Sequence, residues 1–288
     1  MSKKPNLFIL GAPKCGTTTI YHWLGQIQDI FISNVKEPHY FCEDYQLTNL
    51  KAYKDLYKNS VSYKYALDAS VWYFYHKSWR DIIKHNPNSK FILLLRNPLL
   101  MMQSMHSQQI FNGNELEPQF NEAIKLNDLR SKGQTAKVKK GYFSQHLAYI
   151  NSCCLDNILE KFIHEVPHEN RLILTLDQLE SEENTWNIIC DFLKIDNVKI
   201  KFRISNRRRI RRFIWLDTFV LFLVSLKKII GFNKRLGILT KVRGFNTKTI
   251  NSEYDKKLDI DSNVTLRINK CVKNYETLLK IKLDNWYC

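Results

Sequence analysis

A glycine-bounded loop near the start of the chain carries residues that bind anions. Gly11 and Gly16 have the spacing of the two glycines in the triphosphate-binding pattern G-x-x-x-x-G-K-[ST]. The lysine of that pattern is absent after the second glycine, where Thr17 stands, and Lys14 lies inside the loop instead. Glycines let the backbone wrap closely around an anion, and Lys14, Thr17 and Thr18 supply a cation and two hydroxyls. We therefore expect an anion-binding loop that leads into a helix.

The position of the lysine argues against transfer of a γ-phosphate. A P-loop kinase needs a lysine on the β- and γ-phosphates and a carboxylate that helps to hold Mg²⁺. Thr17 replaces that lysine, and an apolar strand predicted at 91–95 ends in Arg96, where an aspartate would have to stand. The loop is therefore predicted to bind the end of a nucleotide without a metal. A small-molecule P-loop kinase remains an alternative function.

A second pair of anion-binding residues follows that strand, in the stretch RNPLLMMQS. Arg96 ends the strand, Pro98 begins a helix, and Ser104 comes eight residues after the arginine. A guanidinium fork and a hydroxyl on the same side of this helix would bind a second, separate phosphate.

The elements that must position these residues form an alternating pattern. Continuous apolar runs at 6–10, 91–95 and 171–176 predict buried strands, and helices are expected after the loop, after Pro98, from about 180, and at 76–85, 118–129, 143–162 and 262–286. This pattern predicts an α/β fold of three layers, P-loop-like, with a central parallel sheet flanked by helices. One domain over residues 1–288 is expected, with a helical, basic elaboration at about 206–250. The residues expected to face inward in the last helix are Val264, Leu266, Ile268, Val272, Tyr275, Leu278 and Leu279.

Together these motifs resemble the sulfotransferases that use 3′-phosphoadenosine 5′-phosphosulfate (PAPS). The loop matches the family pattern P-K-[SC]-G-T-[ST], which binds the 5′-phosphosulfate, through Pro13, Lys14, Cys15, Gly16, Thr17 and Thr18. Arg96, Pro98 and Ser104 match the family's R-x-P with a serine eight residues after the arginine, which binds the 3′-phosphate. The resemblance implies PAPS as cosubstrate and no required metal.

A third match is KEPHYF at residues 36–41, which looks like the K-E-P-H-[FY]-F segment of bacterial and glycan-modifying members. The resemblance implies that an acceptor hydroxyl or amine attacks sulfur while Lys14 stabilises the leaving oxygen. Glu37 is the first candidate for the base, because the glutamate has that proposed role in the glycan enzymes. His39 is the second, because cytosolic members use a histidine. The implied acceptor is a carbohydrate or glycolipid, although the aromatic residues at 72–75 would suit an apolar acceptor as well.

The chain departs from the family pattern in two places. Ala69 stands where glycan sulfotransferases often have the lysine of E-K-[ST]-P-x-Y. The late K-G-R turn that closes over the 3′-phosphate is not found as such, and Arg208, or its neighbours Arg207 and Arg209, is assigned to that contact. Weaker similarities to the family are found at 67–74, at 140–147 and in the final NWY.

The charge of the chain fits an anionic partner. Forty-four Lys and Arg against 28 Asp and Glu leave a formal charge of +16. A lysine-rich proteome explains such a surplus equally well. The surplus and the basic run at 206–212 also suggest a nucleic-acid-binding protein, as another alternative function. That alternative does not account for two phosphate-binding motifs in the family's order, so no nucleic-acid partner is expected.

The remaining features concern location. Residues 213–232 have the length of a membrane span, but Asp217, Lys227 and Lys228 interrupt them. This segment is interpreted as a hydrophobic helix packed on the sheet, with a peripheral membrane helix as the second interpretation. Seven scattered cysteines without a C-x-x-C pair predict reduced thiols and no metal site, and the N-terminus lacks a signal peptide, so a cytoplasmic location is expected.

Overall fold

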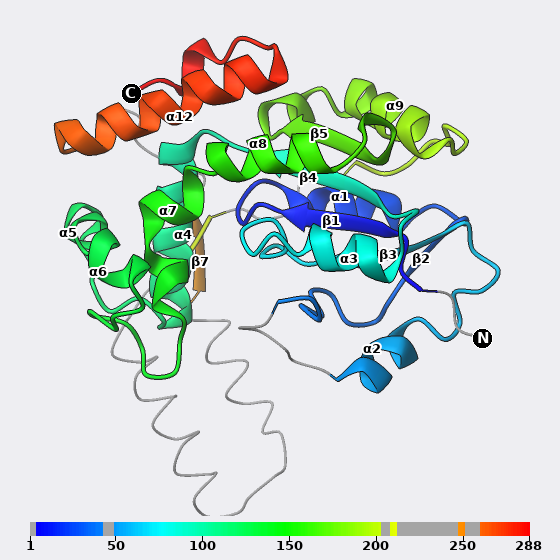
Figure 1. The fold of residues 1–288 in the computed structure, drawn as a ribbon, viewed down its shortest axis with the longest axis horizontal. Coiled ribbons are helices and arrows are strands. Elements are labelled where there is room, and N and C mark those ends of the chain that lie inside the picture. The colour runs from blue at the N-terminus through cyan, green and yellow to red at the C-terminus, as the bar shows by residue number, and fades with distance from the viewer. Residues whose placement is uncertain (1–3, 43–48, 203–207, 212–246, 251–259) are drawn as a thin grey trace, which may run out of the picture.

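The computed structural model describes residues 4–42, 49–202, 208–211, 247–250 and 260–288, with the backbone alone for 208–211 and 247–250 (Figure 1). Within these residues, five parallel strands form one sheet in the order β2-β3-β1-β4-β5. The strands are β1 (Leu7–Gly11), β2 (Ile30–Ile32), β3 (Tyr65–Ala69), β4 (Lys90–Leu95) and β5 (Arg171–Thr175). The three strands predicted from apolar runs are confirmed as β1, β4 and β5, while β2 and β3 had not been predicted.

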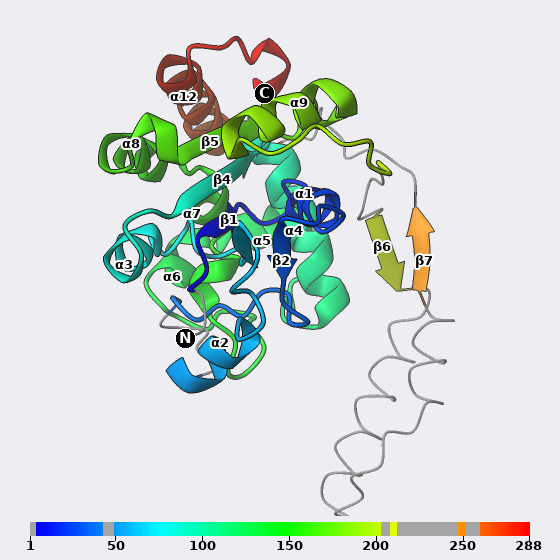
Figure 2. The same ribbon diagram turned by 90° about the vertical axis from the view of Figure 1, so that its right-hand side faces the viewer.

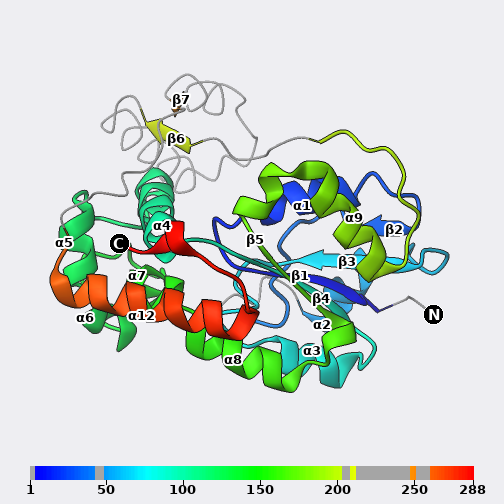
Figure 3. The same cartoon turned by 90° about the horizontal axis from the view of Figure 1, so that it is seen from above.

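Helices cover both faces of this sheet. Figure 3 shows α1 (Thr17–Leu24) and α9 (Glu182–Leu193) on one face, and α3 (Trp79–His85) and α8 (Asp156–Glu165) on the other. This arrangement confirms the predicted three-layer α/β fold. It follows from the parallel pairing, because each connection must cross a face of the sheet to reach the start of the next strand.

A second group of helices lies beyond the carboxyl ends of the strands (Figures 1 and 3). It contains α4 (Pro98–Asn112), α5 (Phe120–Lys125), α6 (Asn127–Ser131) and α7 (Tyr149–Cys153). The long C-terminal helix α12 (Ser262–Leu279) packs on α8 and α4, and α2 (Leu50–Leu56) follows the KEPHYF segment in the chain. Two further strands, β6 (Arg208–Arg211) and β7 (Thr247–Ile250), form an antiparallel pair (Figure 2), and β6 lies next to α4.

Several predicted helices are shorter than expected or broken. The segment 118–129 forms α5 and then α6, and 143–162 forms the 3₁₀ helix η2 (Ser144–Leu147), α7 and α8 in turn. Between α7 and α8 the backbone N–H of Leu155 donates to the hydroxyl of Tyr275 on α12, so a tertiary hydrogen bond replaces a helical one. Helix α3 begins only at Trp79, because the preceding residues pair with the end of β1: the Phe74 N–H donates to the carbonyl of Leu10.

The last helix also ends earlier than predicted. It stops at Leu279, where Lys280 takes a left-handed conformation (φ 56°), and a short 3₁₀ helix, η5 (Asp284–Trp286), follows. Leu266 is 66% exposed, so its predicted inward position was wrong. The other six residues of the predicted face are buried or packed against the core.

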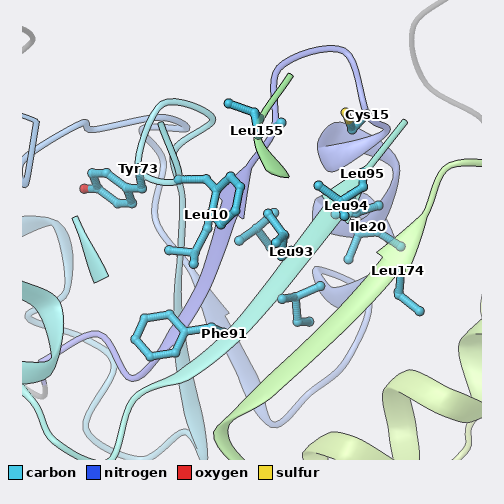
Figure 4. Packing of buried hydrophobic residues seen from close by; sticks show 14 of the residues in the cluster. Leu10, Cys15, Ile20, Tyr73, Phe91, Leu93, Leu94, Leu95, Leu155 and Leu174 are labelled. Carbon is cyan, nitrogen blue, oxygen red and sulfur yellow. The ribbon is translucent and has the colours of Figure 1, made fainter. Parts of the chain in front are cut away.

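The core lies on both faces of the central strands. All five residues of β1 are buried, as a strand covered on both sides requires. Figure 4 shows Leu94 of β4 beside Ile20 of α1, while Leu93 lies beside Leu10. Burying such a side chain fully contributes about 1.5–3 kcal/mol, so this layer anchors the strand ends that carry the candidate site.

Gly11, the last residue of β1, provides a test of this packing. Its φ is +124°, and a Cβ there would lie 2.2 Å from the backbone carbonyl oxygen of Val71. Because a backbone atom cannot swing away, we expect Gly11→Ala to lower the free energy of unfolding by about 3 kcal/mol or more in urea denaturation.

Gly113→Ala is the matched control for that substitution. Gly113 is also left-handed (φ +71°) but has no atom within 4 Å of an added Cβ. Gly113→Ala should lower the free energy of unfolding by only about 1 kcal/mol, which is the cost of a left-handed backbone at a residue with a Cβ. Equal losses in the two variants would contradict the close approach of Val71.

Candidate functional site

The candidate site residues follow strands that end at one edge of the sheet, called here the carboxyl edge. The glycine loop (residues 11–18) begins at the end of β1, Arg96 follows β4, and the KEPHYF segment (residues 36–41) comes after β2. The segment 70–78 follows β3. Parallel strands bring these four connections to the same edge, which is where open α/β sheets bind their ligands.

The glycine loop ends in a helix N-terminus that is open to an anion. Gly16 is the N-cap of α1 with φ 87°, it makes no side-chain cap hydrogen bond, and the first turn of α1 holds no acidic residue. Lys14 also has a left-handed backbone, with φ 65°. The backbone N–H groups at the start of α1 carry a partial positive charge, and this geometry supplies that charge together with the cation of Lys14.

One face of α4 is turned toward the glycine loop. The thiol of Cys15 lies 3.7 Å from the sulfur of Met101, and the Lys14 ammonium donates to the side-chain carbonyl of Gln108 over 3.2 Å. Ser104 is three residues after Met101 and four before Gln108, so the helical repeat places it on the same face. Ser104 therefore lies on the α4 face that makes these two contacts with the loop, and its pairing with Arg96 at a second phosphate stays a prediction.

Arg96 joins the second anion-binding position to the first. Its Nη1 donates to the carbonyl oxygen of Lys14 over 3.1 Å, so the guanidinium lies against the glycine loop. Arg96 and Lys14 are thus in contact, and Ser104 lies on the α4 face that contacts the same loop. Gln108, which holds the Lys14 side chain, was missed, because a glutamine on a helix gives no sequence signal.

Cys15 is placed inside the loop but is not a nucleophile. Burial raises the pKa of its thiol to about 12, against the smaller opposing effect of the Arg96 charge. A thiol reacts as its thiolate, so at neutral pH this side chain is a small buried hydrophobic group.

The two candidate bases lie close together on the KEPHYF segment. One oxygen of the Glu37 carboxylate pairs with Lys36, and the other lies 3.4 Å from Nε2 of His39. The Glu37 side chain is 32% exposed and that of His39 only 6%. Both residues have positive φ, 61° and 50°, a conformation that non-glycine residues rarely adopt and that tends to occur at functional sites.

The charge state of Glu37 follows from these contacts. Burial pushes its pKa up, but the hydrogen bond of His39 and the charge of Lys36 together outweigh burial, and the pKa is lowered below its ordinary value. Glu37 is therefore an ionised carboxylate at neutral pH, in the form that accepts a proton.

Hydrogen bonds hold the KEPHYF segment to the residues after β3. The backbone N–H of His39 donates to Oγ of Ser70 over 3.1 Å, and that of Phe41 donates to the hydroxyl of Tyr73 over 3.4 Å. The Ser70 N–H in turn donates to the carbonyl of Ile9 on β1. The segment with the candidate bases is thus tied to the strand that carries the glycine loop.

A histidine pair that sequence analysis did not single out lies beside this region. The ring of His146 stacks on Trp72 with centroids 3.7 Å apart, and its Nε2 lies 2.9 Å from Nε2 of His76. Burial, followed by the charges of His76 and His39, lowers the pKa of His146 to about 3. His146 is therefore neutral, and it belongs to the segment 140–147 that showed only weak similarity to the family.

The C-terminal residues brace both anion-binding positions. Asn97, next to Arg96, donates its side-chain N–H to the carbonyl of Trp286 over 3.1 Å, and the Trp286 indole donates to the Asp177 carboxylate over 2.6 Å. Asp177 begins the 3₁₀ helix η4 (Asp177–Glu180), and an added Cβ on Gly16 would meet side chains of this region. The final NWY motif therefore holds the residue next to Arg96 and, through Asp177, the region beside Gly16.

The remaining predicted residues are placed less completely. Arg208 is the first residue of β6, and its side chain lies outside the described part of the structure. Residues 213–232 also lie outside it. Among the described residues, no helix is both long and apolar enough to cross a membrane, and no three His, Cys, Asp or Glu side chains gather as metal ligands would.

The fold is similar to those of solved sulfotransferases. The crystal structure of a sulfotransferase from Alicyclobacillus acidocaldarius has 17% sequence identity and a TM-score of 0.68, with 99% of each chain covered. The sulfotransferase domain from the curacin biosynthetic pathway has 13% identity and a TM-score of 0.50, with 98% of this chain and 100% of that chain covered. At such identities the likeness concerns the fold. Comparison with curated protein sequences gave no match.

The family model described as the sulfotransferase domain matches residues 4–164, which are more than half of the chain. The matched region contains the glycine loop, the KEPHYF segment, Arg96 and Ser104. The chain therefore belongs to the sulfotransferase family and is a transferase of sulfuryl groups.

Proposed function

We propose that this sulfotransferase moves the sulfuryl group of PAPS to a hydroxyl group, or an amine, of a carbohydrate or glycolipid. The observation that carries the proposal is the α4 face on which Ser104 lies between the contacts to Cys15 and Lys14, with Arg96 bound to the same loop. It brings cationic and hydroxyl groups for two separate phosphates within one connected site, as a nucleotide with a 5′-phosphosulfate and a 3′-phosphate requires.

The donor would be held by the chain's own cations and amides. Residues 13–18 and the open N-terminus of α1 would bind the 5′-phosphosulfate, and Arg96 and Ser104 would bind the 3′-phosphate, with Arg208 as the proposed late contact. The fit is good because α1 has no side-chain cap or acidic first turn to compete with an anion. These groups supply positive charge without a metal.

The reaction follows from this charge arrangement. An acceptor hydroxyl oxygen forms a bond to sulfur as the bond between sulfur and the bridging phosphate oxygen breaks. Lys14 and the loop amides stabilise the negative charge that this oxygen takes up. The proton of the acceptor passes to the base, and the products are the sulfated acceptor and 3′-phosphoadenosine 5′-phosphate (PAP).

Glu37 is favoured as that base over His39. Its carboxylate is ionised and about a third exposed, whereas the His39 side chain is buried and lies against Glu37. An acceptor can therefore reach Glu37 more easily, and His39 suits the role of orienting it. His39 stays the second candidate.

The proposal of a polar acceptor is supported by where the aromatic residues after β3 lie. Trp72, Tyr73, Phe74 and Tyr75 would suit an apolar acceptor if they were exposed, but the first three are buried and Tyr75 is only partly exposed. Lys36 and Glu37 are both partly exposed at the candidate base. Charged, partly exposed groups are better partners for a hydroxyl-rich ligand than for an apolar one.

A cytoplasmic location is part of the same proposal. The seven cysteines are free thiols, six of them buried, which fits a reducing compartment. A peripheral membrane contact through 213–232 rests on the sequence pattern of that segment alone.

Donor binding is tested without an acceptor. PAP at a hundredfold excess over its Kd, with EDTA present, should raise the Tm by roughly 5 °C, because binding adds about 2.7 kcal/mol and about 1 kcal/mol moves Tm by 2 °C or more. Arg96→Ala should lose most of that rise in differential scanning fluorimetry. The control, Arg80→Ala, removes an arginine paired with Glu165 and should keep the full rise in Tm. A rise with ATP and Mg²⁺ but none with PAP would overturn the proposed donor.

The base is tested by Glu37→Gln. Using labelled PAPS and the best acceptor from a panel of neutral glycans, sulfated glycans and glycolipids, we expect kcat to fall at least about 100-fold while the Kd for PAP is unchanged. Because the pKa of Glu37 is lowered, Glu37 stays a carboxylate down to below pH 4.5, so it produces no acid limb near pH 6. Glu122→Gln, at an exposed ion pair, is the control. Undiminished turnover in Glu37→Gln would transfer the role to His39.

The brace behind the site is tested by Asn97→Ala. This variant loses the cap on α4, where Asn97 accepts from the Leu100 N–H, and the link to Trp286. We expect a loss of about 1 kcal/mol in stability together with a several-fold weaker Kd for PAP in calorimetry. Asn49→Ala removes the equivalent cap of α2 and should cost stability alone. A PAP affinity equal to wild type in Asn97→Ala would show that the brace is not needed.

A further inference from the structure

A buried carboxylate lies behind the KEPHYF segment and belongs to neither the donor site nor the candidate base. Asp68, near the end of β3, is 1% exposed. Its oxygens accept three hydroxyl hydrogen bonds, from Tyr53 over 2.8 Å, Ser70 over 2.8 Å and Tyr73 over 2.9 Å. A buried carboxylate is expensive to keep, so a reason for it should be found in what its partners do.

Two of these three hydroxyls are the ones that hold the KEPHYF segment. Ser70 donates to Asp68 and accepts the backbone N–H of His39, and Tyr73 donates to Asp68 and accepts the backbone N–H of Phe41. A hydroxyl has one proton and two lone pairs. Because the carboxylate takes the proton in both cases, each hydroxyl turns a lone pair to the amide.

We propose that Asp68 is a positioning residue for sulfuryl transfer, which orients Ser70 and Tyr73 so that they hold the KEPHYF segment with Glu37 at the acceptor. This role rests on the proposed function, because it acts through the candidate base. It differs from the roles of Lys14, Arg96 and Ser104, since Asp68 is fully buried and makes its side-chain contacts to hydroxyls of the protein.

The chemistry requires an ionised carboxylate at this position. A carboxylate accepts hydrogen bonds at both oxygens, whereas an asparagine or a protonated acid has a donor in place of one of these acceptors. The hydroxyl that faces this donor must accept from it, and it then lacks an acceptor for its own proton. On the Oδ1 side that hydroxyl is Ser70, which already accepts from His39. The link to the KEPHYF segment would therefore loosen.

Burial also makes this group responsive to pH. It raises the pKa of Asp68 to about 6, while the hydrogen bonds of Tyr53, Ser70 and Tyr73 and the charge of His39 oppose the rise. Tyr57, directly after α2, also faces it, since the charge of Asp68 helps to raise the pKa of Tyr57. The three tyrosines have pKa values well above their ordinary value and stay protonated donors. As pH falls through about 6, Asp68 gains a proton and its hold on the segment weakens.

The first experiment compares kcat among variants of the network. Asp68→Asn should lower kcat roughly 10- to 100-fold with the Kd for PAP unchanged, because the base is displaced while the donor site is intact. Ser70→Ala and Tyr73→Phe should each reproduce part of the loss. Tyr53→Phe is the matched control: it also takes a hydroxyl from Asp68, but no hydrogen bond links that hydroxyl to the backbone of residues 36–41 among the described contacts. An equal loss of kcat in Tyr53→Phe, or an unchanged kcat in Asp68→Asn, would overturn the proposal.

The pH profile separates positioning from a purely structural role. In wild type kcat should show an acid limb near pH 6, and this limb should be absent in Asp68→Asn. Because the pKa of Asp68 is raised in the folded protein, its ionised form lowers stability above pH 4, and stability falls as pH rises toward 6. Asp68→Asn should therefore lose activity without losing stability at pH 7.5. A loss of stability that parallels the loss of kcat would point to a structural role and against the proposal.

Amide hydrogen exchange tests the same role without donor or acceptor. The amides of His39 and Phe41 should exchange faster in Asp68→Asn than in wild type. Ser70→Ala should speed exchange at His39, and Tyr73→Phe should speed it at Phe41. Unchanged exchange would overturn the proposal. If wild type transfers no sulfuryl group from PAPS while exchange responds as expected, the proposed function fails and the holding of the KEPHYF segment by Asp68 stands.

Discussion

The position of β1 at the centre of the sheet is the constraint on which the site depends. β1 pairs with β3 on one side and β4 on the other, so its carboxyl end lies between the residues after those two strands. Gly11 can end the strand there only because it lacks a Cβ, which lets the carbonyl of Val71 approach. The glycine loop, the Arg96 turn and the residues that hold the KEPHYF segment meet at this point, so the pairing of β1 with both neighbours sets their relative positions.

Helix α4 extends this arrangement to the proposed position of the second phosphate. Met101, Ser104 and Gln108 form the face toward the glycine loop. A different part of α4 is anchored where His106 pairs with the carbonyl of Glu117 over 2.8 Å. Nearby, the guanidinium of the fully buried Arg130 makes two hydrogen bonds to the Glu115 carboxylate, which also accepts from Tyr149. Such a buried pair adds little net stability, but it tolerates few alternative arrangements, which suits a helix that presents one face to the glycine loop.

The sequence was most informative where a local pattern has one structural meaning. Long apolar runs identified β1, β4 and β5, whereas β2 has three residues and β3 contains the charged Asp68, so neither reads as a buried strand. The prediction of one continuous helix at 143–162 was wrong. The periodic pattern of apolar residues does not show that the helix is interrupted near Leu155, whose N–H donates to Tyr275, a residue 120 positions away. The inward face of α12 was predicted except at Leu266, which the helical repeat alone had assigned to the core.

By itself, the sequence determined the fold class and the family, and it predicted which residues bind the donor and which carboxylate and imidazole serve as base, because these motifs combine side-chain chemistry with short fixed spacings. Only the tertiary structure decided what supports them: Gln108 on Lys14, Trp286 on Asn97, and Asp68 behind the KEPHYF segment. Gln108 and Trp286 lie 94 and 189 positions from the groups that they hold. Asp68 acts on the KEPHYF segment through its near neighbour Ser70, which lies 31 positions from His39. Their role follows from strand order and helix packing, which bring distant hydrogen-bonding groups within about 3 Å and which no local spacing encodes.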